Sequence, residues 1–275
     1  MVCLRKERIL TKCFMPDYSS QLQAACSAAR AAGAFLRARF TDAGPVNEEL
    51  PHDIKLQLDK DTQAIIVESL LRAFPDYAVL GEEGNAGSAE AEAVWIVDPI
   101  DGTVNYFYGI PIFCVSIALR VRGELVLGCV YDPMQDECFT AVAGGAAYLN
   151  GREIKVSSRK ELAKSVIFVG HGSHDGSGEE GIRRFAYLSA RVRKIRILGS
   201  AALTLCYIAA GRFDAYIENR IHLWDFAAAG VILASAGGQL EFTPGADSAE
   251  TGSVIAWNGQ LPLPQTLSEY SSEAS

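Results

Sequence analysis

The sequence has no excess of positive charge. Its 275 residues include 25 Lys and Arg against 33 Asp and Glu, which gives a net charge of -8 at pH 7. A field of that sign repels polyanions, so we expect no nucleic-acid partner. It would also repel a phosphate-bearing small molecule, so a phosphate site in this chain needs its own local cations.

Long apolar runs and targeting signals are missing as well. The longest apolar stretch, residues 226–238, is shorter than the roughly 20 residues that a membrane-spanning helix needs. The opening residues MVCLRKERILTKCFMPD contain no clean apolar segment followed by a small-residue cleavage site, so we read no signal peptide. We therefore expect a cytoplasmic protein with no membrane partner.

The cysteines show none of the usual pairing patterns. Their number is odd and no CxxC pair occurs, which favours reduced thiols over a disulfide framework. A Gly-x-Ser-x-Gly motif or a Cys–His arrangement for a covalent nucleophile is also missing. The seven positions are Cys3, Cys13, Cys26, Cys114, Cys129, Cys138 and Cys206.

The apolar periodicity predicts a mixture of helices and strands without internal repeats. Helices are expected over residues 17–40, 59–74, 179–190, 200–210 and 225–236. Strands are expected over residues 77–80, 94–97, 113–121, 124–131, 166–169, 194–198, 213–217 and 254–257. Residues 41–52 and 171–180 are expected to be loops. This mixture predicts stacked layers of helix and sheet.

Three separate segments place carboxylates at strand ends or helix starts. They hold Glu82, then Asp98 and Asp101 in the run DPIDGT, then Asp225 after Trp224. Each alone has an ordinary explanation as a solvated loop, a turn or a helix N-cap. Together they supply four negative charges, enough to balance two Mg²⁺ ions, which prefer oxygen ligands. Two such ions can assist an in-line displacement at phosphorus.

These motifs and their order resemble those of the inositol monophosphatase family. The resemblance is carried by GEE at 81–83, WIVDPIDGTVNY at 95–106, GGAAYLNG at 144–151, GSAA at 199–202, DAYIE at 214–218 and IHLWD at 221–225. It implies an α/β (α+β) fold, the five-layered α-β-α-β-α sandwich of that family. It also implies a magnesium-dependent, lithium-sensitive phosphatase that is a cytoplasmic homodimer.

The resemblance also divides the chain. A single phosphatase domain is expected over residues 17–265, with its N-terminal half ending near 155 and its C-terminal half starting near 156. Residues 1–16 are expected to form a disordered N-terminal extension, and residues 266–275 a polar tail.

By the same resemblance, five residues would hold two or three Mg²⁺ ions. Glu82, Asp98 and the carbonyl of Ile100 would bind the first ion, and Asp98, Asp101 and Asp225 the second. Glu82 is also expected among the catalytic residues. The family's threonine-rich stretch is replaced here by DIKLQLD at residues 53–59, so the details of a third metal site do not carry over.

The remaining expected roles concern the water and the substrate. Asp59 and Thr103 would orient the attacking water. The amides of Gly102 and Thr103, at the start of a short helix, would bind phosphate oxygens. Ala201 and Glu218 would line the hydroxyl-bearing part of the substrate.

The expected partner is a small-molecule phosphate ester, with inositol monophosphate favoured. Fructose 1,6-bisphosphate, histidinol phosphate and 3′-phosphoadenosine 5′-phosphate are the alternatives within the family. An inactive family member that serves as a binding or regulatory subunit is the alternative of a different class.

Overall fold

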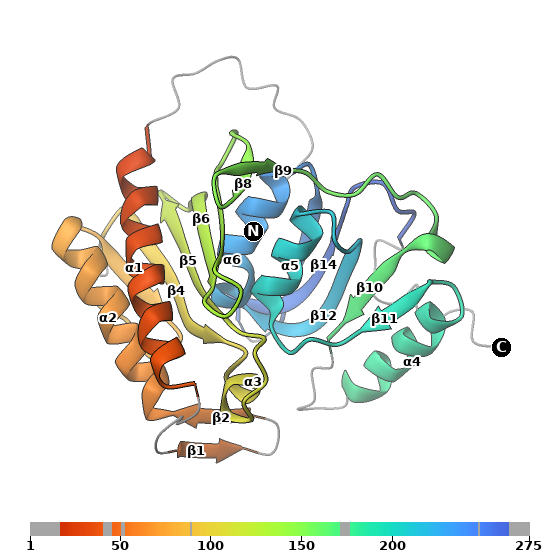
Figure 1. Cartoon of the computed structure of the whole chain (residues 1–275), viewed down its shortest axis with the longest axis horizontal. Coiled ribbons are helices and arrows are strands. Elements are labelled where there is room, and N and C mark those ends of the chain that lie inside the picture. Colours follow the sequence, from red (N-terminus) through yellow and green to blue (C-terminus); the bar gives the residue numbers. More distant parts are fainter. Residues whose placement is uncertain are drawn as a thin grey trace.

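Five layers of helix and sheet lie side by side in the computed structural model (Figure 1), which describes residues 17–40, 46–50, 53–88, 90–170, 177–246 and 248–263. Helices α1 (Ser19–Ala38) and α2 (Gln57–Ala73) form the first layer, beside a seven-stranded sheet. Helices α5 (Ala201–Ala209) and α6 (Leu223–Ser235) separate this sheet from a five-stranded sheet. Helix α4 (Ser177–Ser189) covers the far side. The α-β-α-β-α sandwich predicted from the sequence is therefore confirmed.

The seven-stranded sheet is formed by the first half of the chain. Its strands follow one another in sequence order, β3-β4-β5-β6-β7-β8-β9. The pair β3–β4 is parallel and the other pairs are antiparallel. The bounds are β3 (Ala78–Gly81), β4 (Ala93–Asp101), β5 (Cys114–Val121), β6 (Glu124–Asp132), β7 (Glu137–Val142), β8 (Ala147–Leu149) and β9 (Arg152–Ile154).

The five-stranded sheet comes from the second half, in the order β11-β10-β12-β14-β13. Strand β10 is parallel to both of its neighbours, whereas β14 is antiparallel to β12 and β13. The bounds are β10 (Val166–Val169), β11 (Lys194–Arg196), β12 (Ala215–His222), β13 (Gln239–Pro244) and β14 (Thr251–Trp257), and a 3₁₀ turn, η1, covers Leu162–Lys164.

Helix α6 explains the longest apolar stretch of the sequence. It lies between the two sheets, so it is apolar on all sides and most of its residues are buried. Strand β6 approaches its backbone closely, because a Cβ at Gly128 would lie 2.1 Å from the carbonyl oxygen of Ala228. No helix within the described ranges is long and apolar enough to cross a membrane.

Several local predictions were wrong. Residues 46–50, expected to be part of a loop, form strand β1 (Val46–Leu50), which pairs with β2 (Asp53–Leu56) in a two-stranded antiparallel sheet. The polar sequence gives no apolar alternation there, and the pairing with β2 decides the conformation. Residues 177–180, also expected to be loop, begin helix α4. Strand β12 continues past Ile217 to His222, because β14 pairs with it on both sides of an irregularity after Glu218.

Other predictions fall outside the described residues. These are the N-terminal extension at 1–16, the polar tail at 266–275 and residues 171–176 of the predicted loop.

Candidate active site

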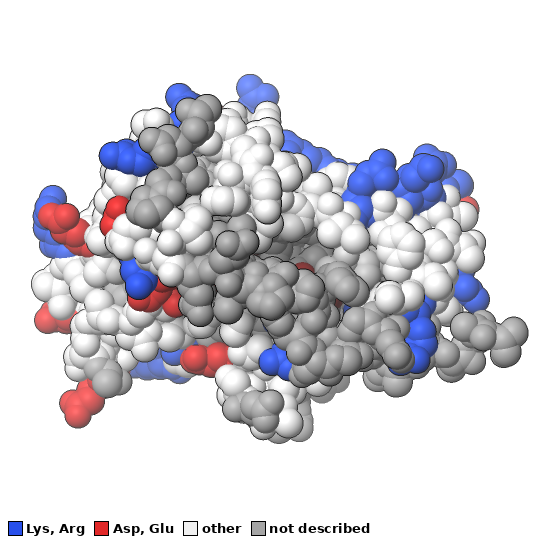
Figure 2. Space-filling model, turned by 90° about the horizontal axis from the view of Figure 1, so that it is seen from below, with Lys and Arg blue, Asp and Glu red and all other residues white. Residues whose placement is uncertain are grey.

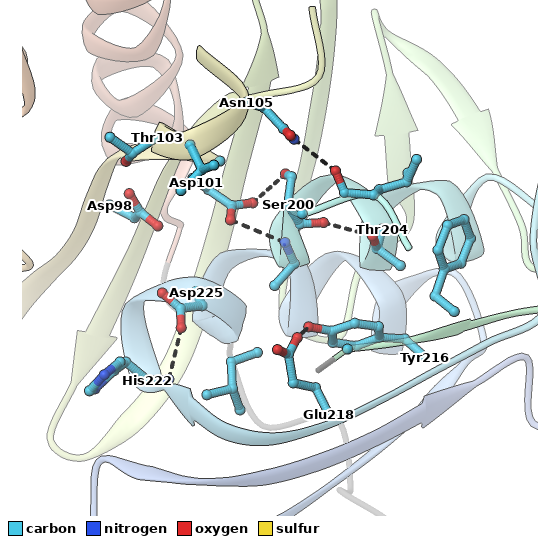
Figure 3. Close-up of a pocket in the computed structure, with 18 of the residues that line it drawn as sticks. Asp98, Asp101, Thr103, Asn105, Ser200, Thr204, Tyr216, Glu218, His222 and Asp225 are labelled. Atoms are coloured by element: carbon cyan, nitrogen blue, oxygen red, sulfur yellow. Dashed lines mark hydrogen bonds between the residues drawn. The ribbon is translucent and has the colours of Figure 1, made fainter. Parts of the chain in front are cut away.

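A cavity of about 730 Å³ lies where the seven-stranded sheet, the central helices and the five-stranded sheet meet (Figure 3). Five carboxylates from the ends of β3 and β4, from β12 and from the start of α6 line it. They are Glu82, Asp98, Asp101, Glu218 and Asp225. Chain segments more than 100 residues apart thus contribute acidic groups to one space.

The end of β4 turns two of these carboxylates into the cavity. Pairing with β5 is regular up to Asp98 and resumes at Asp101, with a register shift between them. Within this turn, Oδ1 of Asp98 accepts a hydrogen bond of 3.0 Å from the backbone N–H of Ile100. In a regular strand, side chains alternate between two faces, so residues three positions apart would point to opposite sides. The irregularity instead lets both Asp98 and Asp101 line the cavity.

Gly102 then starts the short helix α3 (Thr103–Phe107). Its φ is 102°, in the region that side chains disfavour, and a Cβ there would lie 3.0 Å from the carbonyl oxygen of Ile112 and 3.2 Å from that of Gly199. Only glycine meets both requirements without strain.

Asp101 is held by the N-terminus of α5. It accepts hydrogen bonds from the Ser200 hydroxyl at 2.6 Å and from the backbone N–H groups of Ala201 and Ala202 at 3.1 and 2.7 Å. Ala201 lines the cavity, as expected, but its N–H donates to Asp101. The part played by Ser200 was missed, although a serine before an apolar helix is a recognisable capping signal.

Asp59 reaches the site from α2. One of its oxygens accepts the backbone N–H of Leu56 at 2.7 Å, and the other lies 3.3 Å from Oγ1 of Thr103. The same Thr103 hydroxyl lies 2.9 Å from the carbonyl oxygen of Ile100, so its single proton has two acceptors. Burial raises the pKa of Asp59 to about 7, and the charges of Glu82 and Glu83 act in the same direction.

Asp225 stands in the first turn of α6, where it accepts the backbone N–H of His222 at 2.8 Å. The His222 ring stacks on Trp224 with 4.8 Å between ring centres. Asp59 and Asp225 therefore have the same local role. In each, one carboxylate oxygen accepts a backbone N–H at the start of its own helix.

The carboxylates destabilise one another's charged forms. Burial raises the pKa of Asp98 well above its usual range, and the charges of Glu82, Asp101 and Asp225 raise it further. Burial likewise raises the pKa of Asp101 and of Asp225. A divalent cation would remove this repulsion, and the all-oxygen donor set suits a hard ion such as Mg²⁺.

Glu218 lies on β12, beside the end of β10. It accepts a hydrogen bond from the Tyr216 hydroxyl, and burial raises its pKa to about 7. A Cβ at Gly170 would lie 2.1 Å from its carboxyl carbon, so that glycine makes room for it. Arg220, which is exposed and has a φ of 57°, also lines the cavity.

The structure brings together all ten residues named from the sequence. Asp59 lies one hydrogen bond behind the cavity wall, through Thr103. Asn105 had no predicted role, yet its side-chain amide donates to the carbonyls of Ile112 at 2.8 Å and Leu198 at 2.7 Å. It thereby joins two loops around the cavity. Nine of the ten residues named from the sequence line the cavity: Glu82, Asp98, Ile100, Asp101, Gly102, Thr103, Ala201, Glu218 and Asp225.

Known proteins share this sequence and architecture. The sequence profile of the inositol monophosphatase family matches residues 17–273. The inositol-1-monophosphatase of Rhizobium meliloti is 40% identical over 215 residues, 77% of this chain and 80% of that protein. The Nus factor SuhB of Pseudomonas aeruginosa is 38% identical over 246 residues, 86% of this chain and 91% of that protein.

Solved structures agree. The extragenic suppressor protein suhB from Bartonella henselae superposes with a TM-score of 0.85 at 33% identity, over 94% of this chain and 100% of that one. The inositol monophosphatase from Anabaena superposes with a TM-score of 0.77 at 36% identity, over 89% of this chain and 93% of that one. From the family profile that covers it and the solved structures that superpose on it, the chain belongs to the inositol monophosphatase family.

Proposed function

We propose that the protein hydrolyses a small phosphate monoester with Mg²⁺, and that inositol monophosphate is its best substrate. The observation that carries this proposal is the meeting of Glu82, Asp98, Asp101 and Asp225 at one cavity beside the N-terminus of α3. These four negative charges balance two divalent cations. The cations would offset the electrostatic repulsion between an acidic protein and an anionic substrate.

In this proposal, five residues supply the metal ligands. Glu82, Asp98 and the Ile100 carbonyl hold one ion, and Asp98, Asp101 and Asp225 hold the second. When bound, Mg²⁺ lowers the pKa of water and offsets the negative charge of the phosphoryl group. Asp101 keeps its orientation through Ser200 and α5. Asp225 keeps its own through the start of α6.

The protein's own groups position the reacting water. The Thr103 hydroxyl gives its proton to Ile100 or Asp59, which leaves its oxygen free to accept a hydrogen bond from water. Burial and neighbouring charges raise the pKa of Asp59 to about 7 in the metal-free site, and bound Mg²⁺ would lower it, so Asp59 would act as a carboxylate that accepts a hydrogen bond from the water. The amides of Gly102 and Thr103 bind the phosphate, and Ala201 and Glu218 meet the alcohol portion. Water is thus the nucleophile, and no phosphoenzyme forms.

A regulatory role is the second candidate, because several relatives bear the name Nus factor SuhB. The charge of the molecule is also unevenly distributed. Basic residues gather at the end of the molecule that carries α4 and β11 (Figure 2), where Arg193, Lys194 and Arg196 are exposed. A partner could dock there without using the cavity.

We place the phosphatase in the cytoplasm as a homodimer, by analogy with the family.

Phosphate release from a panel of esters tests the proposal. The panel is inositol monophosphate, fructose 1,6-bisphosphate, histidinol phosphate and 3′-phosphoadenosine 5′-phosphate, each with Mg²⁺ or with EDTA. Turnover should require Mg²⁺, should be highest on inositol monophosphate, and should be inhibited by lithium.

A matched pair of variants locates the activity. Asp98→Asn should remove most of it, about 4 kcal/mol or roughly a thousandfold, while Asp76→Asn, an exposed aspartate away from the cavity, should behave as wild type. Activity in EDTA, or in Asp98→Asn, would refute the proposal. A well-folded protein that hydrolyses none of the esters would favour the regulatory candidate.

A further inference from the structure

Three cysteines from three separate elements meet behind the seven-stranded sheet. Cys26 lies on α1, Cys129 on β6 and Cys138 on β7. The Sγ atoms of Cys26 and Cys129 are 3.7 Å apart, and those of Cys129 and Cys138 are 3.9 Å apart. All three sulfurs lie within 4.8 Å of one another. None of them lines the active-site cavity.

This spacing suits a metal–thiolate centre. A zinc–thiolate bond is about 2.3 Å long, so two sulfurs on one tetrahedral ion lie about 3.8 Å apart. Two of the three Sγ–Sγ distances are within 0.1 Å of that separation, and the third, between Cys26 and Cys138, is within 4.8 Å. An ion could therefore be bound with little movement of the backbone. Sulfur ligands select thiophilic ions over Mg²⁺, which distinguishes this cluster from the carboxylate site.

The surroundings supply one ready thiolate and access from the surface. Cys129 and Cys138 are buried, while Cys26 is half-buried and opens the cluster toward the surface. Hydrogen bonds from Cys129 and Cys138 lower the pKa of the Cys26 thiol, and the nearby positive charge of Arg30 acts in the same direction. The pKa values of the Cys129 and Cys138 thiols are raised, so a bound ion would have to displace their protons. Three thiolates and one divalent ion carry one net negative charge, and the guanidinium of Arg30, ion-paired with Asp136, lies near it.

Arg30 is fixed near the cysteine cluster by two contacts. Its Nη1 donates to Oδ1 of Asp136 at 2.9 Å, and its guanidinium lies over the ring of Tyr131, 4.9 Å from the ring centre. The Tyr131 hydroxyl donates to the same Asp136 oxygen at 2.9 Å. The cation is thus fixed beside the cluster by side chains from β6 and the following turn.

We propose that Cys26, Cys129 and Cys138 form a binding site for a thiophilic divalent cation of the zinc type. Three protein ligands leave one position for water or an outside ligand. The bound ion would join helix α1 to strands β6 and β7, so it would stabilise the first two layers of the sandwich against separation.

Cobalt and zinc test this with the full-length protein, reduced and saturated with Mg²⁺ so that the carboxylates are occupied. One equivalent of Co²⁺ should produce thiolate-to-metal charge-transfer absorption, which carboxylate ligands cannot give. X-ray absorption of the zinc-loaded protein should show about three sulfur neighbours at about 2.3 Å. Zinc should also raise the thermal unfolding temperature.

Cys26→Ser is the main variant, because its side chain is half-buried and its loss should leave the protein folded. It should lose the charge-transfer band and the thermal shift. Cys206→Ala, which removes a buried thiol on α5 outside the cluster, should keep both. Circular dichroism verifies that each variant is folded.

Two results would overturn the proposal. One is the lack of a charge-transfer band in the wild-type protein, or an equal band in Cys26→Ser. The other is a Cys26–Cys129 disulfide in the isolated protein together with no metal uptake after reduction, which would make the cluster a redox pair. Neither result bears on phosphatase activity.

Discussion

The Ser200 hydroxyl donates a hydrogen bond of 2.6 Å to Oδ2 of Asp101, across 99 positions of the sequence. Asp101 ends a strand of the seven-stranded sheet, and Ser200 precedes α5 in the central layer. This bond lowers the pKa of Asp101 and so counters the effect of burial. It joins the two halves of the chain at the carboxylate cluster (Figure 3).

Ser200→Ala should weaken Mg²⁺ activation. Without the hydroxyl, the pKa of Asp101 rises and protons compete better with the metal. Loss of a residue that supports a metal ligand typically costs about tenfold or more in metal affinity. The Mg²⁺ concentration for half-maximal activity should therefore rise about tenfold. Ser165→Ala is the control, because Ser165 is buried and its hydroxyl donates to a nearby backbone carbonyl, that of Leu162, at 2.7 Å. An unchanged Mg²⁺ dependence in Ser200→Ala would contradict this account.

Gly102→Ala should reduce both stability and activity. A left-handed backbone costs a residue with a side chain roughly 1–2 kcal/mol, and the new Cβ would also press against the Ile112 and Gly199 carbonyls. Gly123→Ala is a matched control, since its φ is 87° and a Cβ there meets nothing within 4 Å. Urea unfolding should show a larger loss for Gly102→Ala. Equal losses would mean that the close approach to these carbonyls has no energetic effect.

The metal-free protein should become less stable as the pH rises. Burial raises the pKa of Asp59 to about 7 from its usual 3.8, and burial together with like charges raises the pKa of Asp98. A raised carboxyl pKa means that the folded state holds protons which the unfolded state has released. Stability is therefore lost as the pH rises from the usual carboxyl range through about 7.

Thermal unfolding in EDTA tests this between about pH 5 and pH 8. The unfolding temperature should fall over that range, and Mg²⁺ should restore it most at the upper end. Asp98→Asn should show a shallower fall, because one of the mutually repelling charges is gone. Identical profiles with and without Mg²⁺ would show that the carboxylates do not bind it.

Glu218 is the candidate residue for recognising the alcohol portion of the substrate. Above its pKa of about 7, Glu218 is a carboxylate, which accepts hydrogen bonds, suits hydroxyl groups and repels a second phosphate. Glu218→Gln keeps the shape and should cost about 1–3 kcal/mol on inositol monophosphate. The loss on a simple aryl phosphate should be small. Equal losses on both substrates would instead assign Glu218 to the general support of the site, and a wild-type preference for fructose 1,6-bisphosphate would direct attention to Arg220.

Strong periodic segments were predicted well. The helix expected over 225–236 is α6, from Leu223 to Ser235, and the strand expected over 124–131 is β6, from Glu124 to Asp132. Their apolar content alone determines that they are buried. Strands β1 and β2 were not predicted. They are short, at five and four residues, and they depend on hydrogen bonds to neighbours that a local pattern does not reveal.

The sequence by itself determined the inventory of the site. The runs around Glu82, Asp98 and Asp225 specify which carboxylates are present, and their order identifies the family. The sequence also contains the glycine at position 102. Its positive φ, which permits the turn, is a property of the structure.

Only the tertiary structure decided how these groups are held and charged. The contacts Ser200–Asp101 and Thr103–Asp59 join residues 99 and 44 positions apart. The meeting of Cys26 with Cys129 spans 103 positions. The pKa of a carboxyl or thiol depends on burial and on charges a few ångströms away in space, and no local pattern carries that information.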